Sequence, residues 1–84
     1  MKDVKFAYRH RPTKQWVFLS PSFDFGKTIY LDYIDEFDPG ILYSARNIIE
    51  EDLLRSRWKN MYYAAENFLE FELVEIEIEY KIPE

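Results

Sequence analysis

Alternation of apolar and polar positions dominates the first part of the chain and predicts strands. In residues 3–10 every second side chain is apolar or aromatic, which is typical of a strand with one buried side. A turn around Pro12 follows, because proline fixes a backbone angle that suits turns, and an apolar run resumes in residues 15–19. We therefore predict a β-hairpin over Asp3–Leu19, and a third strand over Lys27–Tyr33, where the alternation returns.

A helical period replaces the alternation in the middle of the chain. The apolar positions of residues 41–53 recur at spacings of three and four, which places them on one face of a helix. Its start has two alternatives: Asp38 as the N-cap before Pro39, or Ser44 as the N-cap after an extended stretch. Residues 61–68 either extend this helix or form a second short one.

The last segment, Leu69–Ile82, alternates again, but its apolar side changes parity between Leu73 and Val74. An inserted residue explains such a change, so we predict a β-bulge at Leu73-Val74 that brings all glutamates of this strand to one side. Without the bulge, the strand would consist of two segments with opposed faces.

The expected fold is one α+β domain over residues 1–84, with β-β-β-α-β order and an antiparallel sheet of about four strands packed by one face on the helix.

Composition narrows the class of protein. There is no cysteine, so a disulfide scaffold and a cysteine-ligated zinc site are excluded. His10 is the only histidine, at a strand end where we expect a surface or turn residue, and neither glycine belongs to a phosphate-binding motif. We therefore predict that the protein is not an enzyme and uses no metal or cofactor. No apolar run is long enough to span a membrane and the first residues do not resemble a signal peptide, so we expect a cytoplasmic protein.

Charge is distributed unevenly along the chain. The net charge is −5, yet residues 1–14 carry five cations against Asp3, while residues 60–84 carry seven glutamates against Lys81. An acidic chain argues against nucleic acid as a partner and favours a protein with a basic surface. Opposite charges are also expected if the two end segments lie side by side, in which case Lys5 and Arg9 would neutralise the glutamates across the strands.

The glutamate row is the main candidate for a binding surface. Alternate residues of a strand are about 6.8 Å apart, close to the spacing of phosphates along a nucleic-acid strand, so the row is either a solvated strand face or a surface that a basic partner recognises. The acidic turn after the third strand either is solvated or extends this surface, and it lacks the EF-hand pattern of calcium sites. The candidate partner-binding residues are Glu70, Glu72, Glu75, Glu77, Glu79, Asp35, Glu36 and Asp38.

Two further functions remain open. Abundant aromatics and a long terminal strand suit a homodimeric structural or regulatory module. The Arg55–Tyr63 segment mixes cations with aromatic rings, as proteins that bind single-stranded nucleic acid do, although cations are favoured at the end of a helix in any case.

A resemblance adds to this picture. The stretches that carry it are Val4-Lys5-Phe6-Ala7-Tyr8-Arg9, Gln15-Trp16-Val17-Phe18, Tyr43-Ser44-Ala45-Arg46 before the helix, and Phe71-Glu72-Leu73-Val74-Glu75-Ile76. In style and order the chain resembles the small uncharacterised proteins encoded by phages of Gram-positive bacteria. The resemblance implies a cytosolic, non-enzymatic protein that binds a host protein, and inhibitors of CRISPR or other defence nucleases are among such proteins. The function that we predict is a binding module for a basic host protein.

Overall fold

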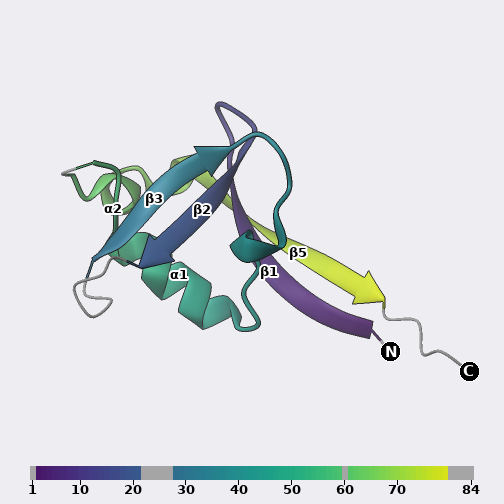
Figure 1. Ribbon diagram of the computed structural model, residues 1–84. Coiled ribbons are helices and arrows are strands. Elements are labelled where there is room, and N and C mark those ends of the chain that lie inside the picture. Colours follow the sequence, from purple (N-terminus) through teal and green to yellow (C-terminus); the bar gives the residue numbers. More distant parts are fainter. Residues whose placement is uncertain (1, 22–27, 60, 80–84) are drawn as a thin grey trace, which may run out of the picture.

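The computed structural model describes residues 2–21, 28–59 and 61–79, which form a five-stranded sheet with two α-helices and two short 3-10 turns (Figure 1). The strands are β1 (Lys2–His10), β2 (Gln15–Pro21), β3 (Ile29–Ile34), β4 (Ser56–Arg57) and β5 (Phe71–Glu79). The helical elements are η1 (Pro39–Ile41), α1 (Arg46–Arg55), α2 (Tyr63–Glu66) and η2 (Phe68–Glu70). The predicted α+β class is confirmed.

The strand order is β4-β3-β2-β1-β5, and all neighbours are antiparallel except β4, which runs parallel to β3. The predicted hairpin and third strand are confirmed. The expected four antiparallel strands in β-β-β-α-β order omitted β4, because two strand residues are too few to leave a hydrophobic period. Of the two alternatives for residues 61–68, the structure has the second short helix, α2. Lys27 of the predicted third strand and residues 80–82 of the predicted last strand lie outside the described residues.

The main core lies between the helices and one side of the sheet, which we call the helix side. Residues directly opposite in neighbouring strands present their side chains to the same side of a sheet, so the register assigns each residue to the helix side or to the opposite side. We call the opposite side the open side, although η1 covers part of it, where Gly40 lies against Phe18 and Ala7 is fully buried. The core on the helix side consists of Tyr8, Val17, Leu19, Ile29, Leu31 and Phe71 from the strands, with Ile49, Leu53 and Ala64 from the helices.

Strands β1 and β5 pair without interruption, from Lys2 opposite Glu79 to His10 opposite Phe71. The predicted β-bulge at Leu73-Val74 is therefore wrong. The change of parity has another cause: the apolar surroundings of β5 change sides along the strand. Near its start, Phe71 and Leu73 pack with the core on the helix side. Farther along, the half-buried residues are on the open side, namely Val74, Ile76 and Ile78.

Strand β1 separates from β2 away from the hairpin turn. The two strands pair only at Arg9 with Trp16 and His10 with Gln15. Farther along β1, Phe6 instead exchanges two backbone hydrogen bonds of 2.8 Å with Tyr43, which follows η1 in the chain. The β1–β5 pair consequently extends away from the other strands as a two-stranded ribbon (Figure 1), in a molecule with extents of 50 × 31 × 22 Å.

The start of α1 differs from both predicted alternatives. Asp38 does act as a cap, but of η1, where its side chain accepts a hydrogen bond of 2.7 Å from the Gly40 backbone N–H. Helix α1 begins only at Arg46, because the intervening chain is extended where Tyr43 pairs with β1. Ser44 is not a cap either, and its hydroxyl accepts a hydrogen bond of 2.8 Å from Lys5. Within the described residues, no helix has the length and apolar character needed to cross a membrane.

Two adjacent leucines of α1 provide a test of this packing. Leu53 is fully buried, whereas 39% of Leu54 is exposed. We expect Leu53→Ala to lower the free energy of unfolding by about 2–5 kcal/mol because it leaves a cavity, and Leu54→Ala to change it by only about 0.5 kcal/mol. Urea unfolding followed by circular dichroism measures both. Equal effects would contradict the orientation of α1 on the sheet.

Candidate functional site

The uninterrupted β1–β5 register divides the predicted glutamate row between the two sides of the ribbon. Glu75, Glu77 and Glu79 lie on the helix side, beyond the part of β5 that packs with the core, and all three are exposed. We call these three residues the acidic row. Glu72 lies on the open side, directly opposite Arg9. Glu70 precedes β5 and belongs to η2.

The cations expected to neutralise the acidic row lie on the other side of the ribbon. Lys5 is on the open side, where its Nζ lies 3.2 Å from the Asp3 carboxylate and also donates to Ser44. Arg9, on the same side, donates from Nε to the Lys14 carbonyl and stands over the Trp16 ring. The expectation that these cations lie on the neighbouring strand is correct, but the expected side is wrong.

The acidic row has no ion pair with any residue that the structure describes. The nearest cation in the β1–β5 register is Lys2, which is exposed and lies opposite Glu79 on the helix side. The other residues opposite the row are apolar, Phe6 facing Glu75 and Val4 facing Glu77. The row is therefore a short line of exposed like charges, of which Glu75 and Glu77 lie opposite apolar side chains and Glu79 opposite Lys2.

In the predicted acidic turn, most of the acidic side chains make local hydrogen bonds. Asp35 accepts a hydrogen bond of 2.8 Å from the Gln15 side chain, and Asp38 caps η1. Glu36 is exposed. Among the described residues no group of three or more metal-ligating side chains is gathered at one place. Two of the three residues predicted in this turn thus have a structural role of their own.

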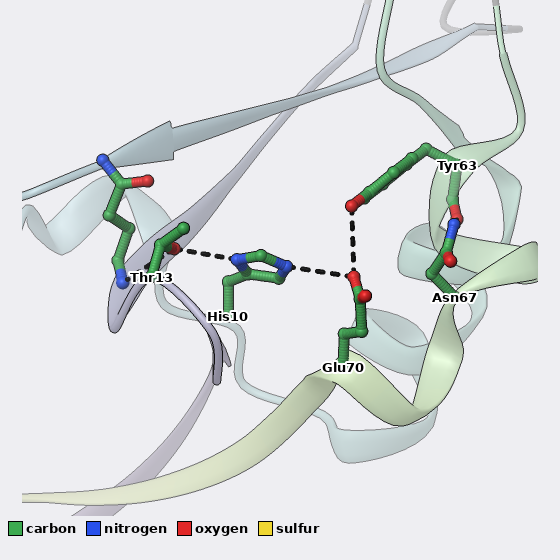
Figure 2. A network of polar contacts seen from close by, with 6 residues as sticks. His10, Thr13, Tyr63, Asn67 and Glu70 are labelled. Atoms are coloured by element: carbon green, nitrogen blue, oxygen red, sulfur yellow. Dashed lines mark hydrogen bonds and ion pairs between the residues drawn. The ribbon is translucent and has the colours of Figure 1, made fainter.

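Glu70 belongs to a polar network that the sequence did not indicate (Figure 2). His10 lies between Thr13 and Glu70: its Nδ1 is 2.8 Å from the Thr13 hydroxyl, and its Nε2 is 3.2 Å from Glu70 Oε2. The Tyr63 hydroxyl donates to the same carboxylate oxygen at 3.1 Å. These contacts join the β1–β2 turn, α2 and the residue that leads into β5.

The expectation that His10 is a surface or turn residue is wrong, because only 5% of it is exposed. A signal for its burial was present in the sequence, since His10 has the same parity as Phe6 and Tyr8 on the apolar side of β1. Its ring packs against Tyr33 and Phe71, with centroids at 4.7 and 5.3 Å. Its partner Glu70 is 60 residues away in the chain, so no local pattern predicts their contact.

The order hydroxyl, imidazole, carboxylate is also the order of groups in enzymes that use a hydroxyl nucleophile. Such enzymes need a substrate site beside the hydroxyl. A hollow of about 410 Å³ near this network is lined by residues 65–70, which places it on the Glu70 side of the network and not at Thr13. The network therefore fits a structural role, in which it fixes the start of β5.

Two partly buried tyrosines, Tyr33 and Tyr43, pack against the core on the helix side. Burial raises the pKa of Tyr33, and the neighbouring Tyr63 and Glu70 raise it further. Burial and the hydrogen bond to Asp52, of 2.8 Å, raise the pKa of Tyr43. The Tyr33 hydroxyl is buried, and it makes no hydrogen bond of good geometry to a described residue, although the Tyr63 hydroxyl is near enough to raise its pKa. The Tyr43 hydroxyl is therefore well paired, whereas the Tyr33 hydroxyl has at best a poor partner.

In the segment predicted as an alternative nucleic-acid site, Arg55–Tyr63, two cations stand over aromatic rings of the same segment. The Arg57 guanidinium lies 4.2 Å from the Tyr62 ring centroid, and the Lys59 ammonium lies 4.8 Å from that of Trp58. Trp58 also packs against the main core. Nucleic-acid binding by this segment stays a prediction, and no contact among its described residues favours it.

Comparison of the chain with protein-family models, with curated proteins and with solved structures gave no match. The functional interpretation therefore rests on the geometry of the chain itself.

The two tyrosine hydroxyls make a matched pair for mutation. We expect Tyr43→Phe to lower the free energy of unfolding by about 1 kcal/mol, because a hydrogen bond to a carboxylate is lost. Tyr33→Phe should leave stability unchanged or raise it by up to about 1 kcal/mol, because a poorly paired buried hydroxyl is removed. Urea unfolding at neutral pH measures both, and an equal loss in the two variants would show that the Tyr33 hydroxyl is satisfied.

The same tyrosines predict an alkaline limit to stability. Their pKa values are raised in the folded protein, so the unfolded chain loses these protons first, from a pH of about 10. The free energy of unfolding should consequently be constant with respect to these groups below that pH and fall as pH rises above it. Urea unfolding at a series of alkaline pH values checks this, and Tyr33→Phe should make the decline shallower.

Glu70 and Glu72 form a second matched pair. Glu70→Ala should lower the free energy of unfolding by about 1–3 kcal/mol, because the buried His10 and the partly buried Tyr63 lose their shared acceptor. Glu72→Ala, at an exposed position, should change it by about 0.5 kcal/mol. Thermal or urea unfolding of both variants is the measurement, and a small effect of Glu70→Ala would contradict the structural role of the network.

Proposed function

We propose that the protein is a non-enzymatic binding module that attaches to a basic surface of another protein through the acidic row. The observation that carries the proposal is the position of Glu75, Glu77 and Glu79 on one exposed side of the ribbon, where no described cation pairs with them. If the three glutamates served only solubility, they could equally lie beside Lys5 and Arg9. Instead, the register places the glutamates and these two cations on opposite sides of the ribbon.

The internal pairing of the other charged groups supports this choice of surface. Lys5 is bound to Asp3, Asp35 and Asp38 accept local hydrogen bonds, and Glu70 belongs to the His10 network. A partner cation that meets the acidic row thus replaces water and counterions rather than an existing ion pair. Lines of like charge on a protein surface also accelerate association with a partner of opposite charge.

The proposed partner is a host protein with a basic groove or segment. The resemblance to small phage-encoded proteins suggests a partner in the cytoplasm of a bacterium, and a defence nuclease, whose nucleic-acid groove is basic, is a suitable target for inhibition. Blocking such a groove requires only affinity and position, so the proposal needs no catalytic group in this chain.

Affinity capture from the lysate of a Gram-positive bacterium tests the proposal. The test variant is Glu75→Lys/Glu77→Lys/Glu79→Lys, and the matched control is Glu50→Lys/Glu51→Lys/Glu66→Lys, which changes the net charge equally at exposed positions of α1 and α2. We expect a basic protein that the natural chain and the control retain, that the test variant loses, and that salt releases.

Circular dichroism and thermal unfolding establish that both variants fold. A partner that the folded test variant still retains would place the interface elsewhere on the molecule. Loss of the partner from both variants would show that it responds to net charge alone, and either result contradicts the proposal.

A further inference from the structure

We propose that the partner segment binds as an added strand on the free edge of β5, in an extended conformation with cations at alternate positions. This inference rests on the proposed function and specifies the chemistry that the acidic row recognises. It uses an observation independent of the glutamates, namely that the side of β5 away from β1 has no strand partner among the described residues.

Strand β5 is the last strand of the sheet, and its only strand partner among the described residues is β1. Its nine residues form a regular ladder with β1, and no strand in the described part of the chain pairs with the backbone groups that face away from β1. A long edge of this kind is a template for the pairing of another chain, and many recognition domains bind extended peptides in this way.

The direction of the backbone groups follows from the bonds of β1. Phe6 directs both its N–H and its C=O to Tyr43, away from β5. In an antiparallel ladder, residues directly opposite each other either exchange both hydrogen bonds or direct both groups outward, in alternation. Glu75 lies opposite Phe6, so its N–H and C=O point to the free edge.

The alternation extends this assignment along the strand. Glu77 and Glu79 have the parity of Glu75 and also direct their backbone groups outward, whereas Glu70 has the other parity and accepts a backbone bond of 2.8 Å from Arg11. The residues that present the acidic side chains are thus the ones that present free backbone donors and acceptors.

An antiparallel strand added here has a defined pattern of side chains. Its residues that exchange hydrogen bonds with Glu75, Glu77 and Glu79 stand directly opposite them, with their side chains on the same side. Lysine or arginine at these positions forms cross-strand pairs of opposite charge. The intervening residues lie beside Val74, Ile76 and Ile78, which are apolar and half-buried, so β-branched residues suit them.

A second copy of this chain is a poorer occupant of the edge. Antiparallel pairing of two β5 strands over the acidic row would place glutamates of one copy opposite glutamates of the other. Like charges directly opposite in a ladder are destabilising. Charge complementarity therefore favours a basic segment over a homodimer.

Synthetic peptides of nine residues, the length of β5, test the inference with the purified protein. The first alternates lysine and valine, beginning and ending with lysine. A second is N-methylated at the lysines that would face Glu75, Glu77 and Glu79, and a third at the neighbouring valines. The three have equal charge, but only the second lacks the N–H groups that would bond to β5.

Titrations followed by the ¹⁵N–¹H spectrum give the affinities and the site. We expect the first and third peptides to bind with similar affinity and to shift the amide signals of Glu75, Glu77 and Glu79 most. The second should bind about tenfold more weakly or worse, because several hydrogen bonds are lost. The variant Glu75→Lys/Glu77→Lys/Glu79→Lys should lose the lysine peptide and bind a peptide that alternates glutamate and valine.

The outcomes separate this inference from the proposed function. If both N-methylated peptides bind equally well and the triple variant still abolishes binding, the acidic row attracts basic chains without strand addition, and only the inference fails. If the triple variant binds the lysine peptide as the natural chain does, both fail. If the amide signals of β5 shift with protein concentration alone, the edge is filled by a second copy and the inference is overturned.

Discussion

The uninterrupted ladder between β1 and β5 decides which side of the sheet every charged residue of the ribbon occupies. Because side chains alternate along a strand, one inserted residue would have transferred Glu75, Glu77 and Glu79 to the side of Lys5 and Arg9. The continuous register keeps the two sets apart. The ladder also leads back to Glu70 and Arg11, whose backbone bond of 2.8 Å continues the same pairing beyond the strands.

The bonds between Phe6 and Tyr43 connect this ladder with the rest of the fold. They occupy the edge of β1 where β2 has already moved away, and they hold the chain extended before α1 begins. Two consequences follow from one contact. First, the edge of β1 that faces away from β5 is paired at Phe6, where β2 no longer reaches it. Second, the residues of β5 whose backbone groups point away from β1 are its glutamates Glu75, Glu77 and Glu79.

Local patterns in the sequence identified most of the elements but not what packs around them. The alternation in residues 3–19 identified the first two strands, since strands with one buried side carry that period. The bulge was inferred because one side of a strand was assumed to be covered along its whole length, whereas the half-buried residues of β5 change sides beyond Leu73. The contacts of Glu70 with His10 and Tyr63 depend on tertiary packing, which the periodicity of a single segment does not encode.

The pairing of β1 with β5 also has a consequence for the order of events during synthesis. β1 and β5 are separated by the whole of the sheet and helices between them, so this ladder closes a long loop and contributes contacts of high sequence separation. On a ribosome, the apolar residues of β1 would emerge well before the strand that pairs with them. The hairpin with β2 uses the other edge of β1, so the nascent chain would expose the edge of β1 that pairs with β5 until β5 is made.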